Sequence, residues 1–575
     1  MPVIAPPLTG LPDELQIRIL CGLDPPSILA CRAVSSQLKE TIDNSIEVYY
    51  HLELALSGMI DGPRPHGSAC TRDRLTALRA YRAAYDTGKH PVQWATIESD
   101  LQNIHSRRGM HVVYHGDNPG GGPMRLAIYR PSASFCGIDE HKISVKGVPE
   151  LSGNFPYVGV VYFDVHEDLL VYAWHVLRPR CHPADAHFGC RLSPLSGDHD
   201  EPHPAATQST IVLNTPTLNP TTTGNVWPII GFRDLIVLRY HCYSFSPAVS
   251  AVVIVNWKTG IVVWQMNLKA EQAVRLLSRT LLAVMDQEAS SPAIHLYSLD
   301  PSVSSDANCS TLTDCKCTLS LPTRGDDPRF ILTPSNDTTG LPSRYRYAGP
   351  SYKASSTPLF LRDPGLTPLV LRYRGGLGIR QRQYMLIVPG QTILEWAYEK
   401  RHQQRVVPWE AWGPRGARMV YVPECTSLLG PLPIEVNGSC VAICNWKGSR
   451  YVVDVYETQP YASLNSPALV RDRHATGFKS SRKPLWMPAE MKVRAPKLAR
   501  KTPPINFEDP LSTKYPIRKT TRVISLKSGE QYGSQCYMLL GHDDIIILRC
   551  TMDHSSLEGN EYGHSYTMFS AANDT

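Results

Sequence analysis

The sequence lacks the features that place a protein across a membrane or outside the cell. No apolar run approaches the roughly 20 residues of a membrane-spanning helix; the longest runs cover 155–163 and 251–255. The opening residues MPVIAPPLTG hold neither a basic nor an apolar segment, so we expect no secretory signal. The sequence therefore predicts a chain that acts in the cytoplasm, the nucleus or both.

Recognisable catalytic motifs are also missing. The glycine-rich run 116–122 has no lysine of the kind that a phosphate-binding loop requires. No Gly-x-Ser-x-Gly nucleophile motif occurs. We therefore expect a protein without enzymatic activity and without a cofactor.

The 15 cysteines form no regular framework, and no Cys-x-x-Cys pair occurs among them. An irregular, odd set without a secretory signal is typical of reduced intracellular thiols. Side chains of the types that bind zinc do gather in one loop. Because prolines and aspartates separate them, the sequence favours a solvent-exposed insertion over a metal site. The loop residues are Cys181, His182, His187, Cys190, His199 and His203.

Composition indicates a globular chain with a large core. Of the 575 residues, 42% are hydrophobic and 19% are charged, and the net charge is +6. The segment 471–501 holds ten basic and two acidic residues, a local charge of +8. It is a candidate nuclear-import signal or contact for an acidic partner, and a solvated insertion explains it equally well. The mild overall charge gives no reason to expect nucleic-acid binding.

The first 60 residues carry helical patterning. Leu11, Leu15 and Ile19 recur every four residues, which predicts an amphipathic helix. The same spacing predicts a second helix after Asp24 and a third over 45–59. Three short helices cannot each bury an apolar face alone, so they must pack on one another and on a partner. The stripe positions of the second and third helices are Cys31, Val34, Leu38 and Ile42, then Val48, Leu52, Leu56 and Met59.

Residues 11–42 resemble the F-box motif. The resemblance rests on the Leu11-Pro12 start, the spacing of the aliphatic residues and the step Cys31-x-x-Val34-Ser35. The chain departs from the motif at Gln37-Leu38, where many F-boxes carry a tryptophan. The resemblance implies docking on a Skp-type adaptor and, through it, a connection to a cullin. The docking residues that it implies are Leu11, Pro12, Leu15, Ile19, Leu20, Leu29 and Val34.

A basic helix is predicted over 72–85, where Leu75, Leu78, Arg82 and Tyr85 share one side. Fungal F-box proteins, which this chain resembles, place a helix of this kind between the F-box and a large domain. The resemblance implies a rigid spacer that fixes the position of a bound target. A solvated linker helix is the alternative.

From about residue 91, short runs with β-strand composition alternate with turn residues. Four runs look like the same strand in successive units: 168–172, 234–238, 280–284 and 544–548. The segments 256–260 and 445–448 look like one repeated hairpin turn, and 409–418 is expected to be a strand edge with a tight turn. This decaying repeat predicts a β-propeller of six or seven blades. A pair of β-sandwiches or an irregular β domain is the alternative.

The predicted organisation is α+β and multidomain. A small three-helix F-box spans 1–60, a linker helix spans 61–90, and a β-propeller-like recognition domain spans 91–575 with a basic insertion at 471–504. The predicted function is the recognition of a target protein for an SCF-type ubiquitin ligase. A stand-alone β-propeller scaffold is the first alternative. An enzyme built on the propeller, which would require bound metal or an acidic cluster, is the second.

Overall fold

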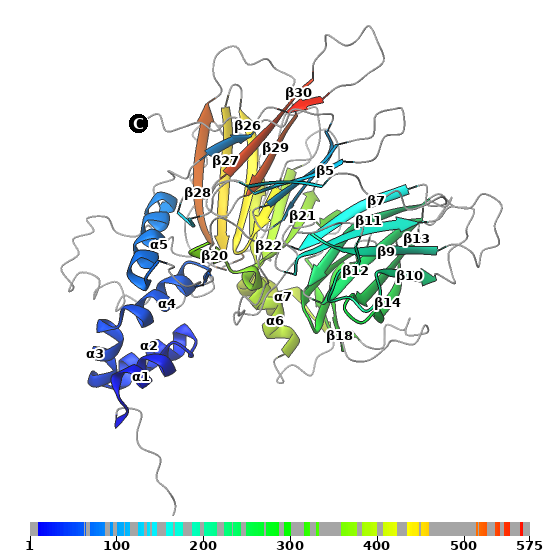
Figure 1. Cartoon of the computed structure of the whole chain (residues 1–575). Coiled ribbons are helices and arrows are strands. Elements are labelled where there is room, and N and C mark those ends of the chain that lie inside the picture. The colour runs from blue at the N-terminus through cyan, green and yellow to red at the C-terminus, as the bar shows by residue number, and fades with distance from the viewer. Residues whose placement is uncertain are drawn as a thin grey trace, which may run out of the picture.

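The computed structural model describes residues 10–62, 64 and 69–86, and then the helices, strands and adjoining turns between residues 92 and 566. Gaps separate these pieces, the longest at 333–357 and 459–512. Helices come first and sheets follow, and Figure 1 shows α4 and α5 on the side of the helical unit nearest the sheets. The sequence correctly predicted an N-terminal helical unit ahead of a large β-rich region.

Four short helices, rather than the predicted three, make up residues 13–56. They are α1 (Asp13–Leu20), α2 (Pro25–Val34), α3 (Ser36–Asn44) and α4 (Ile46–Leu56). The predicted second helix is divided at Ser35, whose backbone is extended and whose hydroxyl accepts a hydrogen bond from the Leu38 amide at 3.3 Å. This N-cap satisfies an amide at the start of α3, so the chain changes direction there.

Seven mainly antiparallel sheets of four or five strands follow in the part of the chain that the structure describes. Most of them consist of four strands that are consecutive in sequence, each paired with the next. Two parallel pairings break this pattern, because β2 lies beside β30 and β23 lies beside β18.

Three sheets come first along the chain. They contain β3 Leu101–Arg107, β4 Met110–His115, β5 Arg125–Arg130 and β6 His141–Val145; β7 Tyr157–Asp164, β8 Leu169–His175, β9 His187–Pro194 and β10 Thr210–Asn214; and β11 Gly224–Phe232, β12 Leu235–Cys242, β13 Val249–Asn256 and β14 Ile261–Lys269.

Four further sheets complete the β-rich region. They contain β15 Ala273–Ser278, β16 Leu281–Asp286, β17 Ala293–Ser298, β18 Cys315–Ser320 and β23 Val406–Val407; β19 Arg329–Leu332, β21 Leu369–Gly375, β22 Arg382–Val388 and β24 Arg418–Val422; β25 Ile434–Asn437, β26 Cys440–Lys447, β27 Arg450–Thr458 and β28 Ile517–Ser525; and β2 Val92–Ala95, β29 Gln535–Leu540, β30 Ile545–Met552 and β31 His564–Tyr566.

Three of the four runs that looked like one repeated strand occupy equivalent places, and the fourth, in β30, differs by having the parallel strand β2 beside it. The four runs form β8, β12, β16 and β30, each paired with the strand immediately before it. In three of the sheets, the residue that follows the third strand donates its amide to the carbonyl that precedes the second strand. These bonds are Leu195 to Asp168 (2.7 Å), Trp257 to Asp234 (2.8 Å) and Leu299 to Thr280 (2.9 Å).

The two hairpin turns that looked alike are not equivalent. The segment 256–260 joins the third and fourth strands of its sheet, whereas 445–448 lies at the end of β26, the second strand of its own sheet. The shared Asn-Trp-Lys letters therefore reflect similar local chemistry at different positions of the fold.

Helix α4 is buried on two opposite faces. Val48 and Leu52 belong to the core of the N-terminal helices. Tyr50 and Leu54, about half a turn away on the helix, belong to a second core that includes side chains of β26 and β27. One helix is thus shared between the N-terminal unit and the sheet of β25–β28.

The chain leaves α4 and enters a short strand, β1 (Met59–Asp61), which pairs antiparallel with β20 (Phe360–Arg362). The helix predicted over 72–85 is present as α5 (Thr71–Asp86), and its buried side chains include Leu75, Leu78 and Tyr81. Strand β1 crosses the predicted boundary between residues 60 and 61. The helical linker therefore packs against the sheets rather than standing between two separate bodies.

The segment predicted as a strand edge and tight turn is helical instead. Helix α7 (Trp409–Gly416) begins after Pro408, and Trp409 and Trp412 are buried in the core between neighbouring sheets. The indole of Trp412 donates to the Ser320 carbonyl at 2.9 Å. Burial of two tryptophans favours the helix despite Pro414 within it. A further helix, α6 (Gly390–Tyr398), and a 3₁₀ turn, η4 (Pro364–Leu366), were not predicted.

Candidate docking surface on the N-terminal helices

Helix α1 turns its aliphatic stripe outward. Leu15 and Ile19, one turn apart, are 46% and 41% exposed. Gln16 is fully buried and donates from Nε2 to the Leu11 carbonyl at 2.7 Å. A glutamine inside and two large aliphatic residues outside reverse the usual partition between core and surface. Neighbouring exposed aliphatic side chains of this kind are typical of a contact surface.

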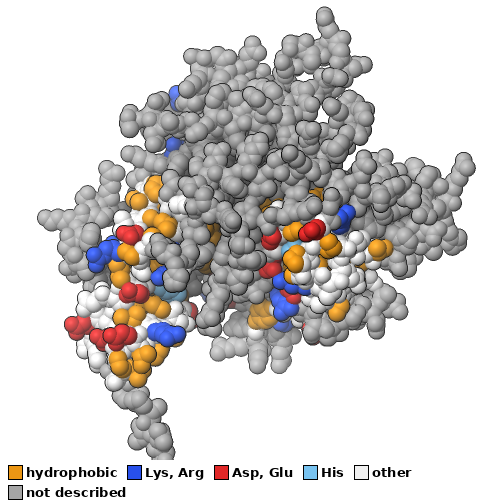
Figure 2. Space-filling model, viewed as in Figure 1, with side chains coloured by type: hydrophobic (Ala, Val, Ile, Leu, Met, Phe, Trp, Pro, Cys, Tyr) orange, Lys and Arg blue, Asp and Glu red, His pale blue; other side chains and the backbone are white. Residues whose placement is uncertain are grey.

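Helix α2 adds a third exposed aliphatic side chain at its end. The helix begins at Pro25, and the carboxylate of Asp24 accepts a hydrogen bond from the Ser27 amide at 2.7 Å. It ends where Ser35 leaves the helical backbone, so Val34 stands at the tip with 79% of its surface exposed. Figure 2 shows hydrophobic side chains gathered at the end of the helical unit away from the sheets.

The other predicted docking residues differ in exposure. Pro12 is exposed, Leu11 and Leu29 are half-buried, and Leu20 is completely buried in the core of the N-terminal helices. A side chain with no exposed surface holds the helix in place from within. We define the aliphatic patch as the three predicted docking residues whose large aliphatic side chains are exposed: Leu15, Ile19 and Val34.

The departure from the F-box motif has a structural consequence. Leu38 is only 5% exposed, so its side chain is used within the helical unit. Gln37 is exposed beside it on α3. At this position the surface therefore offers a partner a polar side chain, where the resemblance would lead one to expect a large apolar one.

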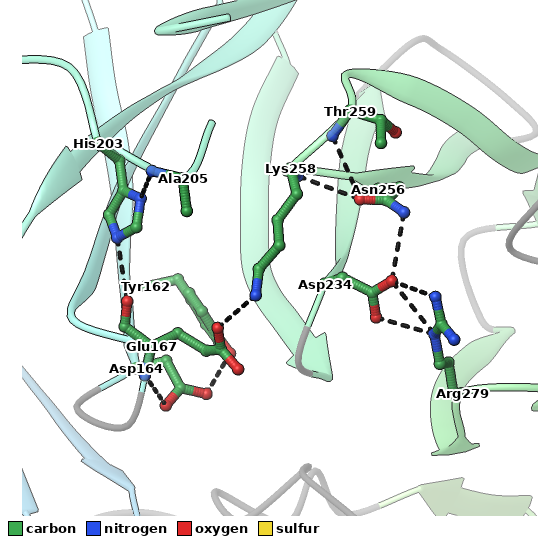
Figure 3. Close-up of polar contacts among 10 residues, drawn as sticks. All are labelled: Tyr162, Asp164, Glu167, His203, Ala205, Asp234, Asn256, Lys258, Thr259 and Arg279. Atoms are coloured by element: carbon green, nitrogen blue, oxygen red, sulfur yellow. Dashed lines mark hydrogen bonds and ion pairs between the residues drawn. The ribbon is translucent and has the colours of Figure 1, made fainter. Parts of the chain in front are cut away.

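A second group of polar residues lies on turns of three neighbouring sheets (Figure 3). Lys258 Nζ lies 2.7 Å from Glu167 Oε2 and links the sheet of β11–β14 to the sheet of β7–β10. Asp234 accepts from Arg279 at 2.6 Å and from Asn256 at 3.2 Å, which extends the connection to β15–β18. Each cation drawn has a carboxylate partner, so this arrangement is suited to holding sheets together.

Two members of the cysteine and histidine loop have structural roles. His203 Nε2 donates to the Glu167 carbonyl at 3.0 Å, and Nδ1 accepts from the Ala205 amide at 3.1 Å. Desolvation lowers the pKa of His203. Burial raises the pKa of the Cys190 thiol to about 12 within an apolar core. The structure does not describe Cys181, His182 or His199. Among all the residues that it does describe, no three or more His, Cys, Asp or Glu side chains are grouped so that they could hold a metal ion.

Two further features of the sequence, the glycine-rich run 116–122 and the basic segment 471–501, lie outside the described residues. Within the part of the chain that is described, no helix is both long and apolar enough to cross a membrane.

Sequence reasoning missed the most deeply buried charged residue of the helical unit. Arg74 in α5 has no exposed surface and contacts Asp61 at 2.9 Å. The signal was present, because Arg74, Leu78 and Tyr81 recur at the spacing of one helical face. The predicted apolar side of this helix was instead Leu75, Leu78, Arg82 and Tyr85, which leaves Arg74 out.

Comparison with known protein families identifies residues 8–48 as an F-box domain. The match covers α1–α3 and the start of α4, the helices that carry the aliphatic patch. The chain therefore contains an F-box domain. F-box domains typically bind Skp-type adaptors, and proteins that contain them are typically substrate adaptors of SCF ligases.

The remaining comparisons add little. A search of curated proteins finds no match. Among solved structures, the acylaminoacyl peptidase of Pyrococcus horikoshii aligns over 63% of this chain and 44% of its own, with 7% identity and a TM-score of 0.31. The chain thus spans less than half the length of that protein, and a likeness at this level carries no argument about fold or function.

Proposed function

We propose that the chain is the substrate-recognition subunit of an SCF-type ubiquitin ligase. The observation that carries the proposal is the aliphatic patch of Leu15, Ile19 and Val34, exposed on helices that match the F-box domain. In this account the patch docks on a Skp-type adaptor, which connects the chain to a cullin. Leu11, Pro12 and Leu29 contribute the surface that they expose, and Leu20 supports α1 from inside.

The size of the patch is sufficient for an anchoring role. Complete burial of one aliphatic side chain contributes about 1.5–3 kcal/mol. Leu15 and Ile19 lie one turn apart on one helix face and keep 46% and 41% of their surface exposed, so a partner that completes their burial would gain roughly half of that amount from each. A few such residues commonly account for most of the binding free energy of an interface.

The β-rich region would bind the target protein. We infer that its sheets are blades of a β-propeller, which was expected to have six or seven blades. Support comes from the recurring strand order and from the backbone bond repeated in three sheets. The strand β11 also lies against β7 and β15, the first strands of the two neighbouring sheets. A cryo-electron microscopy reconstruction of the purified chain tests this directly, since sheets packed as separate sandwiches would exclude a propeller.

In this function the chain performs no chemistry of its own. It raises the effective concentration of target lysines near the ubiquitin-loaded enzyme by binding both partners at once. The proposed compartment is the cytoplasm, the nucleus or both.

Affinity capture from cells with the proteasome blocked tests the proposal against a stand-alone scaffold. The full chain should recover a Skp-type adaptor together with a target protein. Leu15→Asp combined with Ile19→Asp should lose the adaptor and keep the target. Val523→Asp serves as the matched control, because Val523 is 53% exposed on β28 and lies outside the patch.

The scaffold alternative predicts a different result. The wild-type chain would then recover partners of the β-rich region without any adaptor, and the double variant would recover the same set. Equal adaptor recovery by the wild type and a folded double variant would also remove the patch from the proposed docking surface.

A further inference from the structure

The N-terminal helices and the sheets meet at a junction built around Arg74. Its guanidinium Nη1 donates to Asp61 Oδ1 at 2.9 Å, to the Gly62 carbonyl at 3.2 Å and to the Leu359 carbonyl at 2.7 Å. Its Nε donates to the Ala69 carbonyl at 3.3 Å. One completely buried side chain thus joins α5, the segment after α4 and the segment before β20. Arginine suits this place because its guanidinium presents several N–H donors in one rigid plane.

Tyr50 approaches the same acceptors from α4. Its hydroxyl donates to Asp61 Oδ1 at 2.9 Å and lies 3.4 Å from the Leu359 carbonyl. Desolvation, and then the charge of Asp61, raise the pKa of Tyr50, so the phenol stays a donor. Arg64 Nε holds the second oxygen of Asp61 at 2.7 Å.

The backbones on the two sides of the junction are also in direct contact. The Gly62 amide donates to the Leu359 carbonyl at 3.0 Å, and the Asp363 amide donates to the Gly58 carbonyl at 2.9 Å. A Cβ atom at Gly62 would lie 1.9 Å from the Pro358 carbonyl oxygen, so only glycine permits this approach. Residues about 300 positions apart are therefore fixed against each other by pairing of β1 with β20.

Apolar packing surrounds the polar contacts. Phe360 is fully buried, and its ring lies 5.9 Å from that of Tyr81 on α5. Arg82 on α5 contacts Glu53 on α4 at 3.2 Å, which ties the two helices together. The junction thus restrains α4, and α4 also forms part of the core beneath the aliphatic patch.

We propose that Arg74 is a positioning residue that holds the aliphatic patch in one orientation relative to the sheet of β25–β28. The orientation is set by the Arg74 junction, and not by α5 acting as a free-standing spacer. That this orientation matters for ubiquitin transfer rests on the proposed function. The restraint itself is a property of the chain and can be measured without the adaptor.

Pulsed dipolar electron paramagnetic resonance on the full chain tests the proposal. Spin labels are attached through a ketone-bearing unnatural amino acid at Glu40 in α3 and Arg450 in β27, because the chain holds 15 cysteines. The wild type should give one narrow distance distribution. Arg74→Met should broaden it, Arg74→Lys should give an intermediate width, and the control Arg72→Met should leave it narrow, since Arg72 is exposed on the same helix.

Adaptor binding separates this proposal from the proposed function. Arg74→Met should keep its affinity for the adaptor, whereas Leu15→Asp with Ile19→Asp should lose the affinity and keep the narrow distribution. A narrow distribution in folded Arg74→Met would overturn the positioning role, and so would loss of adaptor binding by that variant. If Arg74→Met does not fold, Arg74→Lys and Tyr50→Phe provide the same comparison. Distance distributions as narrow as that of the wild type in both variants would then overturn the positioning role of Arg74.

Discussion

At the scale of single residues, the helical pattern of the sequence identified the apolar positions but not the direction in which they point. Leu15 and Leu20 are both leucines of α1, yet one is 46% exposed and the other is completely buried. Periodicity could not distinguish them, because Gln16 occupies an inward position that a pattern would give to an apolar residue. The burial of Gln16 depends on its hydrogen bond to Leu11, which only the fold reveals.

This difference predicts opposite effects for two identical substitutions. Leu20→Ala should lower the free energy of unfolding by about 2–5 kcal/mol, because it leaves a cavity in the core of the N-terminal helices. Leu15→Ala should change it by less than about 1 kcal/mol and should weaken adaptor binding instead. Chemical denaturation and calorimetric binding on the same samples measure both quantities. A large loss of stability in Leu15→Ala would mean that its side chain is part of the core.

His203 predicts a pH effect on the sheets. Its pKa is lowered, chiefly by desolvation, and the groups that face it are Glu167, Asp168 and Lys258. A lowered pKa means that the folded state binds fewer protons than the unfolded state. The stability contribution is therefore complete above the ordinary histidine pKa of about 6.5 and declines as the pH falls below it.

Thermal melts between pH 5 and pH 8 check this expectation. The midpoint of the wild type should fall on acidification, and His203→Gln should show a shallower dependence because glutamine keeps a donor and an acceptor without titrating. His295, whose pKa is also lowered, is present in both proteins and cancels in the comparison. Parallel curves for the two proteins would contradict the assignment to His203.

At the scale of elements, the strands were predicted well and the short helices less well. Strands such as β16 and β17 combine β-branched and aliphatic residues with clear turn residues between them, and they pair with each other in the structure. Helix α7 was missed because a short segment containing two tryptophans, Gly413 and Pro414 has no clear period. The division of α2 from α3 was missed because the sequence pattern does not distinguish a serine that caps a new helix from a serine on the surface of one continuous helix.

Helix α7 provides a test at this scale. A Cβ atom at Gly413 would lie 2.1 Å from the ring of Trp409, so Gly413→Ala should cost about 1–3 kcal/mol of stability by overpacking. Ala411→Ser, which also adds one heavy atom but on the exposed side of the same helix, should be nearly neutral. Differential scanning fluorimetry compares the two, and equal melting temperatures would show that the Trp409 packing can rearrange freely.

At the scale of the whole molecule, the sequence indicated the order of the parts but not how they join. An F-box ahead of a helix and a β-rich region was predicted, and residues 8–48 match that domain. The junction that joins α4, α5 and β20 depends on contacts between residues about 300 positions apart, such as Arg74 with Leu359. No local pattern encodes such a contact, because it is selected by the packing of the complete fold.

The central claim is that the aliphatic patch docks on an adaptor, and isothermal titration calorimetry with a purified Skp-type adaptor tests it most directly. The wild-type chain should bind, and Leu15→Asp with Ile19→Asp should bind at least about 100-fold more weakly, equivalent to about 2.7 kcal/mol. Val523→Asp should bind like the wild type, and circular dichroism should show that all three chains are folded. Wild-type affinity in the folded double variant would contradict the account.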